Sequence, residues 1–356
     1  MAVKLSERLN KITDPVEQRT LYDLFSRFMN NDATNTLKDV VFADGSGITD
    51  SNGYIVWLEG NTIPTAAGAG YAPGCEFILS NASLGQCPKW VNLGSATSCA
   101  FYPVGPVMGY GCAFAGGPVD LTDDADETYV ALPGVIQQTD YCFASKCVTA
   151  GADQFKAVVP TSGKDSLLID MAMGGNPTDS MDAYYAGFRN LCTPTHDIVF
   201  AGEYAAVTGD DATVAITITG VLATDMAFVT PLTTDDTDTI NLVVCTADTL
   251  TITVSTDPEV AHSYSYMILR KRGTFKPSHY VAYAGQYTAV TGDTTAVAIT
   301  VTGALATDIA IVQCYDSDDD DCFVEAAIAS ADTLTMEVTN DPVTDHSWSY
   351  LILRAY

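Results

Sequence analysis

The sequence is poor in positive charge. Its 356 residues include 16 lysines and arginines against 44 aspartates and glutamates, so the formal net charge at pH 7 is −28. Nucleic-acid binding depends on basic side chains that neutralise phosphates, and anionic membrane surfaces attract basic segments for the same reason. The composition therefore argues against nucleic-acid and membrane partners.

Long apolar runs and export signals are also missing. No stretch of about 18 apolar residues occurs, so no transmembrane helix is expected. The first residues, MAVKLSERLNKITDPVEQ, carry charges where a signal peptide needs an apolar segment, and export by that route is not expected. Hydrophobic residues nevertheless make up 47% of the chain, which is enough for folded cores.

Recognisable catalytic motifs are absent as well. The sequence has no phosphate-binding loop, no dinucleotide fingerprint after a strand, no H-E-x-x-H and no G-x-S-x-G. His262 and His346 hold equivalent positions in two repeats, where a turn or packing role is the simpler interpretation. We therefore expect no catalytic, cofactor-binding or metal-binding residues, no cofactor and no enzyme activity.

The ten cysteines form no zinc pattern, because no pair has C-x2-C spacing. Buried thiols are the default interpretation in the absence of an export signal. Cys314 and Cys322 are the exception, since they flank an acidic segment and could face each other across a hairpin. The sequence leaves this disulfide open.

Two aspartate-rich segments occupy corresponding places in the repeats. The first contains Asp235, Asp236 and Asp238, and the second contains Asp316 and Asp318 to Asp321. Convergent carboxylates could bind calcium, but the second segment lacks the glycine and the final glutamate of an EF-hand loop. A solvated hairpin tip is the preferred interpretation, and a loose calcium site is the alternative.

An internal repeat dominates the second half of the chain. Residues 201–229 align with 284–312 at an offset of 83, and residues 247–270 align with 331–354 at an offset of 84. Shared spacings indicate a diverged copy before them. A proline lies twelve residues before an arginine in all three copies, and a tyrosine lies four before it: Pro177, Tyr185 and Arg189; Pro258, Tyr266 and Arg270; Pro342, Tyr350 and Arg354.

Each repeat has the pattern of a small β module. Apolar residues alternate with threonine or other polar residues, as in Val214, Ile216 and Ile218, which predicts half-buried strands. About six short strands in one module are typical of a small antiparallel sandwich. Because so small a core is marginal alone, stacked neighbours or oligomerisation should complete it.

Residues 1–108 have a different character. Asp14-Pro15-Val16-Glu17 is a helix-start pattern, and the apolar residues after it have helical spacing. Short strands separated by tight turns are expected from Ile48 to Val104. The glycine-rich stretch from Gly105 to Gly117 is interpreted as a linker or a tight β connection between the N-terminal unit and the modules. Candidate partner-interface residues, each of which could instead belong to an intramolecular core, are Leu21, Leu24, Phe25, Phe28, Trp57 and Trp90.

These patterns predict a mainly β protein. Tandem small antiparallel β-sandwich modules should follow an N-terminal unit with one or two helices and short β-hairpins. The expected divisions are an N-terminal helix and β-rich anchoring or oligomerisation unit at 1–108, a diverged module at 109–195, and two further modules at 196–273 and 278–356.

Two segments carry a resemblance to a known family. The module pattern AGxYxAVTGD, TGxLATDxA, ADTLTxxVxxDP and SYxxLR is similar to repeated β-modules at the C-termini of tailed-phage virion proteins. Residues 68–104, GAGYAPGCEFILSNASLGQCPKWVNLGSATSCAFYPV, resemble a segment of phage head decoration and head-fibre proteins. The resemblance supplies no contact motif, so no contact residue is carried over.

The resemblance implies a capsid decoration, or cement, protein. On this view the chain is a virion structural protein, made in the host cytoplasm and placed on the outer capsid surface, where it binds the major capsid protein as a homotrimer. The N-terminal part would contact the capsid and the modules would project. The alternative is a head fibre or surface adhesin whose outer modules bind the host or a glycan; exposed aromatic residues such as Tyr204 and Tyr287 would favour it.

Overall fold

The protein is described by a computed structural model that is mainly β, which confirms the predicted fold class. The structure describes residues 47–82, 86–104, 109–121, 127–132, 135–148, 154–161, 165–172, 182–205, 212–233, 240–254, 263–272, 277–288, 295–317, 324–338 and 346–356. The predicted helix after Asp14 lies outside these ranges. In the described part of the chain, no helix is long and apolar enough to cross a membrane.

The first described unit is a five-stranded sheet, the N-terminal sheet. Its strands follow one another in chain order, with β2 and β3 parallel and the other neighbours antiparallel. Buried side chains such as Phe77, Trp90 and Phe101 form its core. The strands are β1 (Gly47–Thr49), β2 (Ile55–Gly60), β3 (Tyr71–Leu79), β4 (Lys89–Asn92) and β5 (Phe101–Pro103).

The described residues contain eighteen further strands, which form three modules of six strands each, one within each of the ranges 109–195, 196–273 and 278–356. The first module contains β6 (Tyr110–Asp120), β7 (Glu127–Ala131), β8 (Tyr141–Val148), β9 (Gln154–Pro160), β10 (Ser166–Ala172) and β11 (Asp182–Asn190). The second contains β12 (His196–Ala205), β13 (Thr213–Thr217), β14 (Met226–Thr233), β15 (Ile240–Thr246), β16 (Thr249–Val254) and β17 (Ser263–Lys271). The third contains β18 (His279–Thr288), β19 (Ala296–Thr300), β20 (Ile309–Ser317), β21 (Val324–Ser330), β22 (Thr333–Val338) and β23 (His346–Ala355).

All three modules have the same strand pairing. The last strand lies between the first and the third, as in β12-β17-β14, and the fifth lies between the second and the fourth, as in β13-β16-β15. Each module has a core of its own, because apolar and polar residues alternate along its strands. On β16, Leu250, Ile252 and Val254 are buried, while the threonines between them are half-buried. The first module shows this pairing although its sequence has diverged.

The described part of the glycine-rich stretch forms a strand and not a linker. Residues from Tyr110 onward form β6, the first strand of the first module. Gly116 is required there because the ring of Tyr185, its partner on β11, lies where a β-carbon would be. Glycine in this strand therefore reflects close packing and not flexibility.

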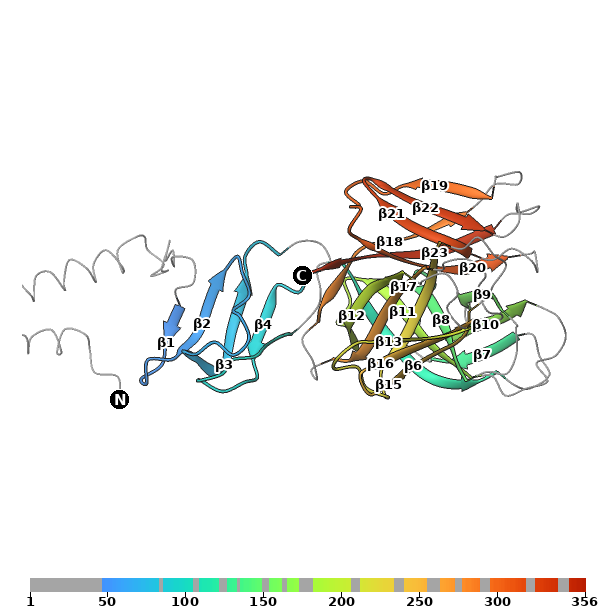
Figure 1. The fold of residues 1–356 in the computed structure, drawn as a ribbon. Coiled ribbons are helices and arrows are strands. Elements are labelled where there is room, and N and C mark those ends of the chain that lie inside the picture. Colours follow the sequence, from blue (N-terminus) through green and yellow to red (C-terminus); the bar gives the residue numbers. More distant parts are fainter. Residues whose placement is uncertain are drawn as a thin grey trace, which may run out of the picture.

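The three modules form a closed ring, an arrangement that the repeats in the sequence did not specify. The third strand of each module contacts the fourth strand of a neighbour, in the pairs β8 with β15, β14 with β21 and β20 with β9. The first strands β6, β12 and β18 also meet, and β6 pairs with both others. The modules therefore surround a common axis with approximate threefold symmetry, beside the N-terminal sheet (Figure 1).

The ring has its own hydrophobic core. Equivalent side chains from the three modules meet in it, and they lie on the faces of the first, third and last strands that point away from the module interiors. Two such sets are Cys112, Ile198 and Val281 on the first strands, and Phe188, Leu269 and Leu353 on the last strands. Neighbouring modules of the same chain thus bury the apolar face that a single sandwich would leave in water.

Candidate functional site

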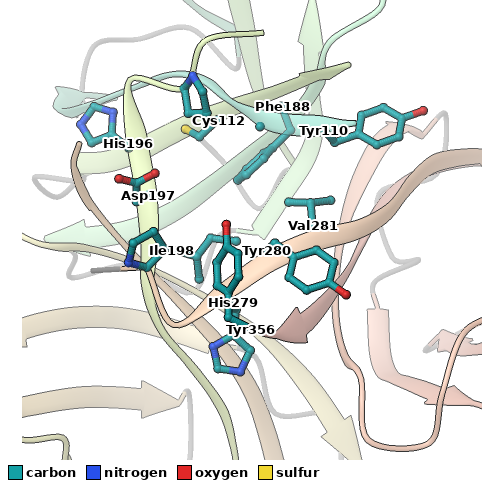
Figure 2. A pocket seen from close by; sticks show the side chains of 13 residues that line it. Tyr110, Cys112, Phe188, His196, Asp197, Ile198, His279, Tyr280, Val281 and Tyr356 are labelled. Atoms are coloured by element: carbon teal, nitrogen blue, oxygen red, sulfur yellow. The ribbon is translucent and has the colours of Figure 1, made fainter. Parts of the chain in front are cut away.

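A pocket opens at one end of the ring axis, where β6, β12 and β18 begin; we call it the axial pocket (Figure 2). Tyr110, His196 and His279 hold equivalent first positions of these strands and all line it. The walls contain Tyr110, Gly111, Cys112, Phe188, Pro194, His196, Asp197, Ile198, Pro277, His279, Tyr280, Val281 and Tyr356.

The backbone around the pocket repeats with the modules. The N–H of Leu191 donates to the carbonyl of Gly109 (2.7 Å), and the same bond joins Arg272 to Thr195 (2.9 Å) and Tyr356 to Ser278 (3.1 Å). These bonds hold the chain after each last strand against the chain before each first strand. The ring symmetry therefore extends to the rim of the pocket.

The two histidines of the pocket are held as neutral rings. The hydroxyl of Thr195 lies 2.9 Å from Nδ1 of His196, and that of Ser278 lies 2.7 Å from Nδ1 of His279. Burial lowers the pKa of both rings, and Lys271 lowers that of His196 further. Neither imidazole therefore brings positive charge to the pocket at neutral pH.

Asp197 is the charged group of the pocket wall. Its side chain is 9% exposed, its Oδ1 lies 3.7 Å from Nε of Arg272, and its Oδ2 has no hydrogen-bond partner. Burial raises the pKa of this carboxyl to about 6, although Arg272 acts in the opposite direction. The carboxylate is thus present at neutral pH in surroundings that disfavour it.

The N-terminal sheet joins the ring beside this pocket. The ring of Trp90 packs edge-on against Tyr356 at a centroid distance of 5.7 Å, and Tyr356 lies 5.3 Å from Tyr280. A guanidinium N–H of Arg272 also points at Sγ of Cys87, 3.7 Å away. The pocket end of the ring is therefore the end that carries the N-terminal sheet.

An aspartate–arginine pair recurs at this end of every module. In each pair, Nε and one terminal nitrogen of the arginine donate to the two carboxylate oxygens at 2.5–2.8 Å. The same arginine also donates to a carbonyl in the turn between the second and third strands, such as that of Gly220 at 2.7 Å. The pairs are Asp140 with Arg189, Asp225 with Arg270, and Asp308 with Arg354.

The sequence pointed to only one residue of each pair. The arginines were noted because they end each repeat, but the aspartates were not. Their signal was present in the LATD segments, where Asp225 and Asp308 close the same tetrapeptide in both clear repeats. The pairs are structural: they tie the last strand to the turn before the third strand.

The buried thiols are poorly suited to act as nucleophiles. Burial raises the pKa of Cys75 to about 11 and that of Cys245 to about 12, and it raises the pKa of Cys112 in the axial pocket as well. A thiol reacts as its thiolate. At neutral pH these three side chains are therefore protonated and behave as small apolar groups.

The proposed partner-interface residues separate into three groups. Trp90 is fully buried, and its Nε1 donates to the carbonyl of Cys87 (2.8 Å), so it belongs to the core and is not available to a partner. Trp57 on β2 is half-buried. The remaining four lie outside the described residues: Leu21, Leu24, Phe25 and Phe28.

The aromatic residues singled out for adhesion do not form an open platform. Tyr287 stacks on Trp348 at a centroid distance of 6.2 Å, and Tyr204 packs against the core of the second module. Both are half-buried. Their burial explains their repetition, since each completes the core of its own sandwich.

Only some of the other residues singled out in the sequence lie within the described ranges. Cys314 is buried on β20, and Cys322, its suggested disulfide partner, lies outside the described residues. The same is true of His262 and of the acidic segments 234–239 and 318–323, while His346 lies at the start of β23. Within the described ranges, no group of three or more His, Cys, Asp or Glu side chains could hold a metal ion.

Comparison with known proteins gives no relative. No protein-family model, curated protein or solved structure matches the chain.

Proposed function

We propose that the protein is a structural component of a tailed-phage particle that decorates and stabilises the outer capsid surface by binding the major capsid protein. The resemblance of the repeats and of residues 68–104 to virion proteins suggests this role. The closed ring is the observation that carries it. A body with approximate threefold symmetry can make three equivalent contacts with a threefold-symmetric lattice position.

The pocket end of the ring has features suited to such contacts. In the described part of the turn between the second and third strands, each module exposes a large apolar side chain: Val135 (40% exposed), Leu222 (47%) and Leu305 (46%). The N-terminal sheet joins the ring at this same end. We therefore assign the pocket end to the capsid.

The ring of modules offers an alternative to the expected homotrimer of chains. Because three modules of one chain already surround one axis, we propose that one chain acts at each lattice position. Light scattering of the purified protein should give the 37.7 kDa mass of a single chain. A mass of three chains would favour the homotrimer and overturn the single-chain proposal.

The decisive experiment uses purified particles of the phage that encodes the protein. Peptide mass spectrometry should detect the chain in purified capsids, and cryo-electron microscopy should place it on the outer surface at threefold positions. Particles assembled without it should lose DNA at lower temperature. Absence from purified particles would overturn the proposal, and a defect confined to host adsorption would support the adhesin instead.

A further inference from the structure

Asp197 stands out against its equivalents in the other modules. The residue paired with the repeated arginine of the last strand is Gly111 in the first module, Asp197 in the second and Tyr280 in the third. All three modules adopt the same strand pairing with these different residues. The fold therefore does not require a carboxylate at this position.

The surroundings of Asp197 compensate only part of its negative charge. Nε of Arg272 lies 3.7 Å from Oδ1, which exceeds the usual length of a charge-assisted hydrogen bond. Oδ2 is buried without a partner, and a buried carboxylate oxygen in that condition is costly. A ligand that donates a hydrogen bond to Oδ2 would remove this cost.

The rest of the axial pocket suits a positively charged ligand. Among the described residues that line it, none is lysine or arginine, and both histidines are held neutral. The walls carry the rings of Tyr110, Tyr280 and Tyr356 (Figure 2). Aromatic rings attract ammonium and guanidinium groups, and the attraction grows when the cation is removed from water.

We propose that the axial pocket binds a small organic cation, with a primary ammonium group donating to Oδ2 of Asp197 and its alkyl part against the tyrosine rings. Binding is non-covalent and needs no other reactant. The site is independent of the capsid role proposed above, so either can fail alone. A free amine and the side chain of a protein lysine share this chemistry.

The test uses the full-length chain and n-butylammonium, with the neutral 1-butanol as the matched ligand. Calorimetry at neutral pH and physiological salt should show saturable binding of the amine and none of the alcohol. Asp197→Asn should weaken binding at least about tenfold, the ratio that 1.4 kcal/mol represents. Glu203→Gln, on the same strand but outside the pocket, should leave it unchanged.

Three results would overturn the proposal. Absence of saturation in the unaltered protein excludes the site. Equal binding by Asp197→Asn shows general attraction to an acidic chain. If that variant melts early, the unaltered protein still decides. Amine affinity should fall as the pH is lowered to about 5, because Asp197 gains a proton, and constant affinity contradicts the site. A lysine-containing peptide that competes with butylammonium would identify the protein source of the cation.

Discussion

The ring of Tyr350 lies over Gly285, its cross-strand partner, where a β-carbon would otherwise be. The same relationship joins Tyr266 to Gly202. It explains why the repeats keep both an Ala-Gly pair in the first strand and a tyrosine four residues before the final arginine.

Gly285→Ala should therefore destabilise the protein. The new methyl group would displace the Tyr350 ring within a packed module, at a cost of about 1–3 kcal/mol. Urea unfolding measures the loss. In a Tyr350→Leu background the substitution should cost much less, and an equal loss in both backgrounds would show that the ring is not the cause.

Asp225→Ala should cause a larger loss. It leaves the buried guanidinium of Arg270 without its carboxylate, and breaking a buried pair in this way costs about 3–5 kcal/mol. The matched control is Glu76→Ala, because Glu76 and Lys89 form an ion pair whose side chains are almost half exposed. That control should change the free energy of unfolding by less than about 1 kcal/mol. Similar losses for the two variants would contradict the assigned role.

Leu191→Gly should stabilise the protein. Leu191 has a φ of 54° and is 70% exposed, so its side chain contributes little burial while its backbone is in the left-handed region. Relief of that conformation is worth about 1 kcal/mol. The midpoint temperature of thermal unfolding should rise for Leu191→Gly. It should fall for Leu222→Gly, because Leu222 is also exposed but does not have a positive φ. A fall for both would contradict the prediction.

The raised pKa of Asp197 gives stability a definite pH dependence. Between about pH 4 and pH 6 the folded protein holds a proton on this carboxyl that the unfolded chain has lost, so this group makes stability decrease as the pH rises. Asp197→Asn should remove that contribution and raise stability at neutral pH by an amount on the order of 2 kcal/mol. Urea unfolding of both proteins across this range measures the difference, and parallel curves would contradict it.

Local pattern was enough to predict the strands. Alternation in segments such as residues 249–254 indicates which side chains a sheet will bury, because side chains point to opposite faces in turn. The repeat indicated that one module occurs twice, and shared spacings located the third. The N-terminal strands could be read for the same reason, from short apolar runs between turns.

The axial pocket could not be predicted in this way. His196, Asp197 and His279 come from two modules, and nothing in the spacing of the chain says that the starts of β12 and β18 meet. The same limit applies to Trp90, whose ring packs against Tyr356 from the other end of the chain.

The sequence by itself determined that the protein is acidic, mainly β and built from repeated modules, because charge, alternation and repetition are local properties of a chain. Only the tertiary structure decided that the modules close into a ring. Closure depends on which faces of distant strands exclude water together, and Cys112, Ile198 and Val281 become one core only when three modules meet.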